Sequence, residues 1–189
     1  LVTREHSQYA DYKTSILAGL YDGMTFVLDC RMIRGSTLDM LQGIRQLWQM
    51  SPNQSITEVC MEKKGVPSDF DQVMKQFAAM TGWCVPIVWD TRQFGEKKAA
   101  IETFLQPLFE NELVVFNEAF RGTERGKQAE YQILKFSRKN NKFIHDDFPD
   151  ALMKADTKMK GKSKRVRTTP TQLVGLVRPA YVSHTRRKT

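Results

Sequence analysis

A tight hairpin followed by alternating helices and strands constrains the fold of this chain more than any other feature. Residues 14–20 and 24–29 alternate in polarity on either side of a Tyr21-Asp22-Gly23 turn. Because Asp-Gly is a strong signal for a two-residue turn, these residues predict two antiparallel strands. Strands that then alternate with helices usually pair in parallel, so we expect an α/β fold with parallel pairing in its later half.

The remaining elements follow from periodicity and from capping residues. Ser36 and Thr37 can cap a helix over residues 38–50, whose apolar side chains recur at spacings of three and four. The other predicted elements are a strand over 56–62, a helix from Ser68 or Asp69 to Met80, a buried strand over 85–89, a helix over 96–110, a strand over 113–116, a helix over 126–138 and a short helix over 146–155.

The composition excludes several classes of protein. With 189 residues, 41% of them hydrophobic, the chain can bury the core of one domain, with or without an appendage. No apolar run approaches the roughly 18 residues of a membrane span, so no membrane association is expected. The start at Leu1, with neither an initiator methionine nor a signal peptide, suggests a piece of a longer protein. The three widely spaced cysteines, Cys30, Cys60 and Cys84, favour reduced thiols in a cytosol-like compartment.

Positive charge is concentrated at the carboxyl end. Residues 154–189 hold eleven Lys or Arg residues and one acid, Asp156, so their net charge is +10. Residues 1–153 carry −2, and the whole chain therefore carries +8. We expect a folded domain over 1–156 and a basic tail over 157–189. Such a tail suggests a polyanionic partner, and a merely solubilising tail is the alternative.

Three carboxylates lie within five residues, at Asp146, Asp147 and Asp150. Pro149 is tolerated only in the first turn of a helix, so these acids are expected at a helix N-terminus. One of them can cap the helix, which is the purely structural explanation. Three neighbouring carboxylates repel one another, however, unless a cation lies between them, and such oxygen clusters suit Mg²⁺ or Mn²⁺.

Glu62 is the second candidate acid. It ends the predicted strand 56–62 and directly precedes Lys63-Lys64-Gly65. Open α/β sheets place their functional sites at the carboxyl ends of parallel strands, which favours a role for Glu62 in a site. A surface salt bridge is the alternative explanation.

Together these segments resemble the C-terminal nuclease domain of the large terminase subunit of tailed bacteriophages, over roughly residues 8–155. The motifs that carry the resemblance are Ala10-Asp11-Tyr12 before the hairpin, Met61-Glu62-Lys63-Lys64-Gly65, Gly95-Glu96-Lys97-Lys98 and His145-Asp146-Asp147 with Asp150-Ala151-Leu152. The closing acidic string is the most specific of them.

The resemblance implies a ribonuclease-H-like fold, a mixed five-stranded sheet flanked by helices. It also implies a two-metal endonuclease that cuts concatemeric viral DNA during packaging in the host cytoplasm. The implied partners are double-stranded DNA, the portal protein, the small terminase subunit and an ATPase domain upstream in the same polypeptide. By match of motif, the catalytic acids are Glu62, Asp146 and Asp147; the ligands of two Mg²⁺ or Mn²⁺ ions are these three and Asp150; and the DNA-contacting lysines are Lys63, Lys64, Lys97 and Lys98.

The family's first catalytic acid lies on a strand before the hairpin, and that strand is not evident here. We expect it upstream of Leu1, with Asp11 as the candidate stand-in, whereas Asp29 matches a non-catalytic position. Two other functions stay open. One is a non-catalytic module that docks on DNA or on the portal ring, and the other is a different ribonuclease-H-like nuclease, such as a junction resolvase.

Deletion of residues 157–189 tests the basic tail, because it removes ten basic residues and no acid. If about five of these charges meet phosphates, duplex DNA affinity of the full chain falls with roughly the fourth to fifth power of the salt concentration. The shortened chain is expected to bind weakly and with a shallower slope in titrations at several salt concentrations. Equal slopes would mean that the tail does not touch DNA.

Overall fold

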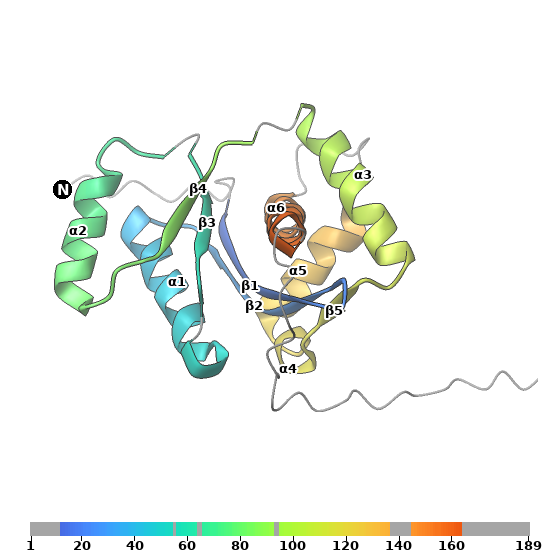
Figure 1. Ribbon diagram of the computed structural model, residues 1–189, viewed down its shortest axis with the longest axis horizontal. Helices are drawn as coiled ribbons and strands as arrows, with labels where there is room; N and C mark the ends of the chain where they lie inside the picture. Colours follow the sequence, from blue (N-terminus) through green and yellow to red (C-terminus); the bar gives the residue numbers. More distant parts are fainter. Residues whose placement is uncertain (1–11, 55, 64–65, 93–94, 137–144, 164–189) are drawn as a thin grey trace, which may run out of the picture.

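The computed structural model describes residues 12–54, 56–63, 66–92, 95–136 and 145–163. They form a mixed α/β fold (Figure 1). The elements, in chain order, are β1 (Lys13–Tyr21), β2 (Met24–Ile33), α1 (Thr37–Met50), the 3-10 turn η1 (Pro52–Gln54), β3 (Val59–Glu62), α2 (Phe70–Thr81), β4 (Ile87–Asp90), α3 (Lys97–Glu110), β5 (Val114–Phe116), α4 (Glu118–Arg121), α5 (Glu124–Lys135) and α6 (Asp147–Ser163).

The predicted hairpin is confirmed. β1 and β2 pair antiparallel, and the turn between them has positive φ at both central residues, 49° at Asp22 and 75° at Gly23. Two left-handed residues are what the turn of a tight hairpin requires, and they explain the Asp-Gly pair in the sequence. β5 then pairs in parallel with β2, which gives a three-stranded sheet in the order β1-β2-β5.

The second sheet is smaller and entirely parallel. β3 pairs with β4, and their carboxyl-terminal residues Glu62 and Asp90 are partners in the register. The described residues therefore contain five strands, but they divide into sheets of three and two instead of forming one five-stranded sheet. Parallel pairing in the later half is confirmed. The expected burial of the 85–89 strand is wrong, because Val88 and Trp89 of β4 are 36% and 37% exposed.

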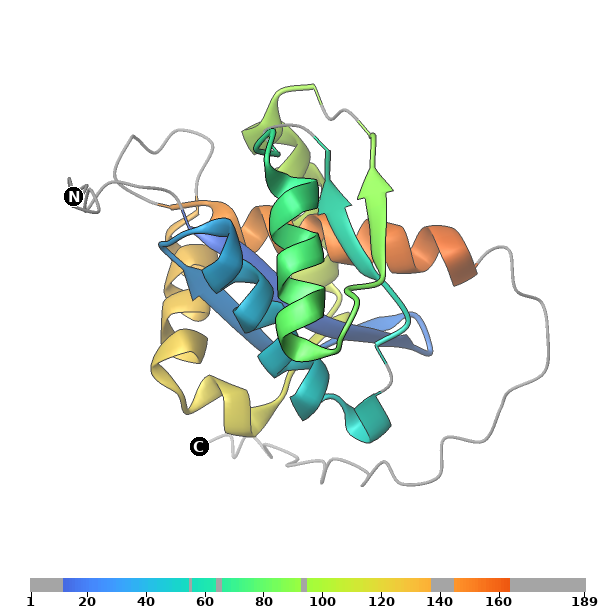
Figure 2. The ribbon, with the colours of Figure 1, turned by 90° about the vertical axis from the view of Figure 1, so that its left-hand side faces the viewer.

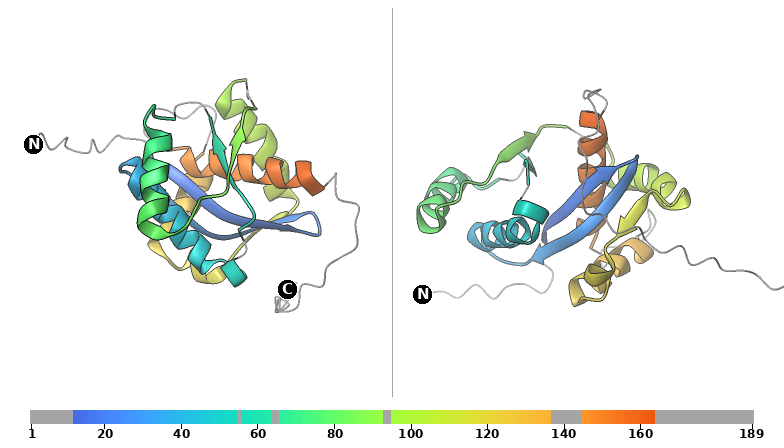
Figure 3. Two further views of the ribbon diagram at one scale, coloured as in Figure 1. Left: turned by 60° about the vertical axis from the view of Figure 1, so that its left-hand side comes forward. Right: turned by 60° about the horizontal axis from the view of Figure 1, so that its bottom comes forward.

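A β-bulge in the hairpin turns side chains from the two ends of β2 toward opposite faces of the sheet. The pairing passes from Leu17 with Asp29 to Ala18 with Val27, so β2 holds one extra residue there. Beyond this bulge the side chains exchange faces. Thr25 contacts Asp156 of α6, whereas Arg31 contacts Gln46 of α1. Figures 2 and 3 show the result: α1 lies in front of the hairpin and α6 runs behind it.

The apolar interior is divided into two cores that share no described residue. The first core, beneath α3, α5 and α6, consists of Val27, Cys30, Ile101, Leu105, Leu108, Phe120, Ala129, Phe148, Leu152 and Met153. The second core, between α1, α2 and the β3-β4 sheet, consists of Leu41, Ile44, Phe77 and Val85. Stability of the whole chain therefore depends on how the two parts are joined.

Helix α6 is longer than the sequence suggests. The helix expected to end at residue 155 continues to Ser163, so the boundary drawn at residue 156 falls inside it. Asp156 explains the extension, because its side chain is only 6% exposed, accepts a 2.6 Å hydrogen bond from Thr25 and forms a 2.8 Å ion pair with Lys160. A deletion meant to leave this helix whole has to begin after Ser163.

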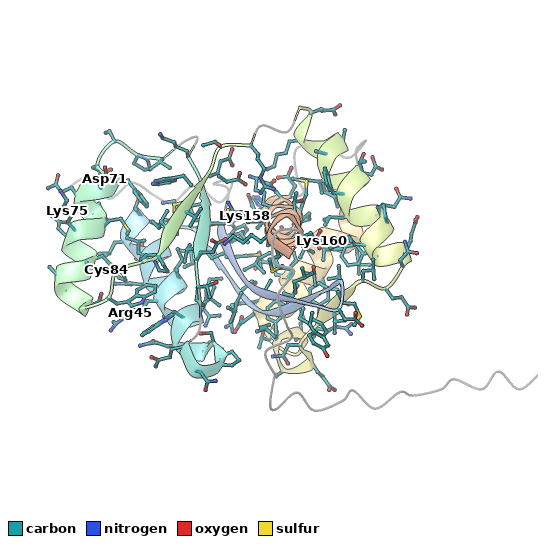
Figure 4. All side chains as sticks on the ribbon, in the orientation of Figure 1. Arg45, Asp71, Lys75, Cys84, Lys158 and Lys160 are labelled. Atoms are coloured by element: carbon teal, nitrogen blue, oxygen red, sulfur yellow. The ribbon has the colours of Figure 1, made fainter. Side chains whose placement is uncertain are left out.

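On its other side α6 meets β3 through charges. Lys154, Lys158 and Lys162 recur every four residues and share one face of the helix, which we call the lysine row. Lys154 pairs with Glu62 at 2.7 Å, and Lys162 pairs with Glu58. Figure 4 shows Lys158 on the side of α6 toward β3, with Lys160 on the opposite side. We call these contacts of the lysine row, with Glu62 at the end of β3 and with Glu58 just before β3, the ionic seam.

No helix in the described part of the chain combines the length and the apolar character needed to cross a membrane.

Two glycines offer opposite tests of the helical packing. In α5, a Cβ at Gly126 would collide with the backbone of Phe120 and lie 2.7 Å from the Cα of Arg121, whereas in α6 a Cβ at Gly161 would meet nothing within 4 Å. Gly126→Ala is expected to lower the free energy of unfolding by about 1–3 kcal/mol through overpacking. Gly161→Ala is expected to raise it by up to about 1 kcal/mol through helix propensity. Urea unfolding of both variants checks this, and a stable Gly126→Ala protein would contradict the α4–α5 packing.

Candidate functional site

The predicted acids come together where the end of β3 meets the first turns of α6. Glu62 is the last residue of β3, and Asp150 lies in the first turn of α6. A single side chain, Lys154, joins them: its Nζ lies 2.7 Å from Glu62 Oε2 and 2.9 Å from Asp150 Oδ2. The two acidic segments, far apart in the sequence, therefore contribute to one site.

At Phe148, in the first turn of α6, the backbone amide is capped by a side chain from another helix and not by one of the acids. The backbone amide of Phe148 donates a 2.8 Å hydrogen bond to the side chain of Gln132, which α5 supplies. Asp147 instead accepts a 3.1 Å hydrogen bond from the backbone amide of Tyr12. The partial positive charge at a helix N-terminus still favours ionised carboxylates there. Pro149 lies inside this turn, as its missing amide hydrogen predicts.

Lys154 stays protonated at neutral pH in this setting. Burial lowers the pKa of its ammonium, but hydrogen bonds to Glu62 and Asp150 outweigh burial, and the pKa lies above the ordinary 10.5. Lys154 and Asp150 are also spaced i, i+4 on the helix, which allows the contact without distortion. The ammonium thus contacts two carboxylates at once, and its single charge offsets half of theirs.

Lys97 provides a second ammonium to the same cluster. From the first position of α3 its Nζ lies 2.9 Å from Asp146 Oδ1 and 3.4 Å from Asp150 Oδ2. Burial lowers the pKa of Lys97, and its contacts with Asp146 and Asp150 raise it to a net value above 10.5. Asp150 Oδ2 is therefore shared by two lysines, while Asp150 Oδ1 is buried without a hydrogen-bond partner.

Asp90 belongs to this edge of the fold although the sequence reasoning missed it. It pairs with Glu62 in the register of parallel strands, and it is only 7% exposed. Arg92 binds both of its oxygens, with Nη2 2.5 Å from Oδ2 and Nε 2.8 Å from Oδ1. The side-chain hydrogen bond from Arg92 holds the pKa of Asp90 below 3.8 against the effect of burial. The argument that selected Glu62, an acid at the end of a predicted strand, applies equally to Asp90.

An aromatic and basic group lies beside Asp147. The guanidinium of Arg34 stacks on the ring of Tyr12 at 4.2 Å and contacts His145 Nε2 at 2.9 Å. His145 in turn packs edge-on against Tyr12, and its Nδ1 lies 3.6 Å from Asp147 Oδ2. His145 and Asp147 thus face the amino-terminal end of the described chain, while Asp150 faces Glu62.

The other predicted residues have different positions. Asp11 and Lys64 lie outside the described residues. Lys63 is exposed directly after β3, and Lys98 lies in the first turn of α3. Asp29 is 4% exposed and paired with Arg31 and Arg125, so it is part of the packing and lies away from this edge.

A metal centre is not assembled in this arrangement. Within the ranges that the structure covers, no group of three or more His, Cys, Asp or Glu side chains is close enough to hold an ion. The two lysines explain this, because they lie between the carboxylates at Glu62, Asp146 and Asp150. Oxygen donors with one unpaired buried oxygen, Asp150 Oδ1, still suit a hard cation such as Mg²⁺ or Mn²⁺.

Neither a scan against protein-family models nor a search of curated proteins found a match for this chain.

The ionised carboxylate of Asp90 stabilises the fold, and acid removes this contribution. Its folded-state pKa lies below the 3.8 of the unfolded chain, so its contribution is present above pH 3.8 and is lost as the pH falls through the folded value. Asp90→Asn is expected to be less stable at pH 7 by about 1 kcal/mol and to lose less stability than the natural chain between pH 5 and pH 2. Urea unfolding across that range measures both effects. Identical pH profiles would show that Arg92 does not stabilise the carboxylate.

Proposed function

We propose that the chain is a metal-dependent endonuclease domain of the ribonuclease-H-like kind, acting on double-stranded DNA during viral genome packaging. The observation that carries the proposal is the meeting of Glu62 and Asp150 at one ammonium, since Lys154 and Glu62 are 92 positions apart in the sequence. Acids from a strand end and from a later helix are the combination that the resemblance implies. Their convergence did not follow from either motif alone.

The proposed fold needs a central strand that the described residues do not supply. In the resembled family a strand precedes the hairpin and carries the first acid. β1 pairs only with β2 and β3 only with β4 within the described ranges, so each keeps one edge without backbone partners there. One strand between these edges would join both sheets into one: β2-β1, the added strand and β3-β4 make five strands, and β5 would be a sixth at the outer edge beside β2. This supports the finer fold assignment as a proposal.

The residues of the site have separable roles in the proposed reaction. Glu62, Asp146, Asp147 and Asp150 would hold the two metal ions, which supply the positive charge that activates water and stabilises the leaving oxygen of a phosphodiester. Lys63 follows Glu62 in the chain and Lys98 follows Lys97, and both would suit phosphate oxygens of the bound strand. Asp90, bound by Arg92, would keep the end of β4 fixed beside Glu62.

One observation favours a second function. Lys97 and Lys154 already form ion pairs with Asp146, Asp150 and Glu62, which is the arrangement of a structural ion-pair network. A domain with that network could dock on DNA or on the portal ring through the basic carboxyl-terminal residues while another domain performs the chemistry. The two functions differ in whether divalent metal supports cleavage.

Supercoiled plasmid provides the test of the first function. The chain is expected to nick or linearise plasmid with Mn²⁺ or Mg²⁺, with little sequence preference, without ATP and not in excess chelator. Asp147→Asn and Glu62→Gln are expected to lose more than about 100-fold in rate, because even residues around metal ligands cost 10- to 100-fold. Asp147→Asn should fold normally, since Asn can still accept from the Tyr12 amide.

Asp71→Asn is the matched control, because Asp71 is an exposed acid in the first turn of α2, away from the site (Figure 4). It should cleave like the natural chain. Cleavage that persists in chelator, or in Asp147→Asn, would contradict the metal mechanism. Binding of DNA without cleavage under any metal condition would favour the docking function.

A further inference from the structure

Lys154 occupies the place in the cluster where a cation is needed. Its Nζ contacts Glu62 Oε2 and Asp150 Oδ2 at 2.7 Å and 2.9 Å, and its side chain is 24% exposed. Any divalent ion held between Glu62 and Asp150 would need these same oxygen atoms. The ammonium and the ion therefore cannot both have full contact with the pair.

The competition is intramolecular. Lys154 is attached to α6 one turn after Asp150, so its ammonium remains close to the acids whatever the protein concentration. The four-carbon stem of lysine is flexible, so the ammonium can also leave toward solvent while the helix stays in place.

The remaining charges leave the site only partly neutralised before metal binds. Lys97 holds Asp146 and shares Asp150 Oδ2 with Lys154, while Asp150 Oδ1 is buried and lacks a hydrogen-bond partner. Two ammonium groups thus face three carboxylates, and the unpaired oxygen is an acceptor that neither lysine reaches. An ion that displaced Lys154 would gain this oxygen as well.

We propose that Lys154 is a built-in counter-cation that a divalent ion must displace from Glu62 and Asp150, and that it thereby sets the metal affinity of the site. The inference rests on the proposed function, because it takes the acids to be metal ligands. Lys154 acts here as a positioning residue: it holds the acids together without metal and lowers their affinity for metal. The same side chain then raises stability and opposes loading.

Titration calorimetry with MnCl₂ at neutral pH tests this. Lys154→Met removes the charge and keeps most of the stem, and it is expected to bind Mn²⁺ about tenfold more tightly than the natural chain. Lys154→Arg keeps the charge and should not bind Mn²⁺ more tightly than the natural chain does. The double variant Glu62→Gln, Lys154→Met should lose the gain, because it lacks one of the two carboxylates.

Thermal unfolding provides a second readout with a matched control on the same helix. Lys154→Met should unfold at a lower temperature without metal, and Mn²⁺ should raise its unfolding temperature more than that of the natural chain. Lys160→Met also removes an ion pair, with Asp156, but on the opposite side of α6. It should lose stability without any added response to Mn²⁺.

The outcomes separate the two claims. Equal or weaker Mn²⁺ binding by Lys154→Met, while the natural chain binds Mn²⁺, would overturn the counter-cation and leave the metal site standing. No Mn²⁺ binding by any variant would overturn both. If Lys154→Met is unfolded without metal, Mn²⁺ must restore a cooperative transition, and failure to do so would also overturn the proposal.

Discussion

Two joints hold together the parts of the fold whose apolar cores are separate: the packing of α1 on the hairpin and the ionic seam between β3 and α6. On one side of the hairpin α1 packs directly, with Gly43 of α1 against Ile33 and Arg31 of β2. On the other side the β3-β4 sheet reaches α6 through Lys154, Lys162 and their acidic partners. Ion pairs at a partly exposed surface are weak singly and are screened by salt. Glu62 is therefore held less firmly against α6 than the buried residues are held within their cores. This weaker contact lies at the candidate site.

Helix α6 serves both parts because its two faces have different chemistry. Phe148, Leu152 and Met153 anchor it in the first core, and Asp156 is fixed to Thr25. With that face fixed, the lysine row has to point toward β3 and Asp150 toward its end, whereas Asp147 lies at the Tyr12 amide. The site is thus positioned by apolar packing behind it, while the contacts across it are electrostatic. This division lets the acids change partners without unfolding the helix.

The sequence predicted most helices and strands, but it did not predict the contacts between them. Period-two alternation and Asp22-Gly23 specify the hairpin, and Ser36 caps α1 with a full capping box to Asp39, so these local signals were sufficient. The length of α6 was missed because Asp156 is held by Thr25, 131 positions away, which no local pattern reveals. The acids Glu62 and Asp150 were identified, whereas Lys154 was overlooked although its i, i+4 spacing from Asp150 was visible. Sequence cannot show that the same lysine also reaches Glu62, and it cannot show that five strands divide into two sheets.

The tryptophans are distributed unevenly between the two parts. All three, Trp48, Trp83 and Trp89, belong to the α1, α2 and β3-β4 part; Trp48 and Trp83 stack with their rings 5.1 Å apart, and Trp89 packs on Phe70. The first core has aromatic rings only from phenylalanine, in Phe120 and Phe148. Tryptophan fluorescence thus observes one half of the molecule, whereas far-ultraviolet circular dichroism observes both. Where salt screens the ionic seam, the two optical signals need no longer change together, and their separation becomes a direct gauge of how strongly the halves are coupled.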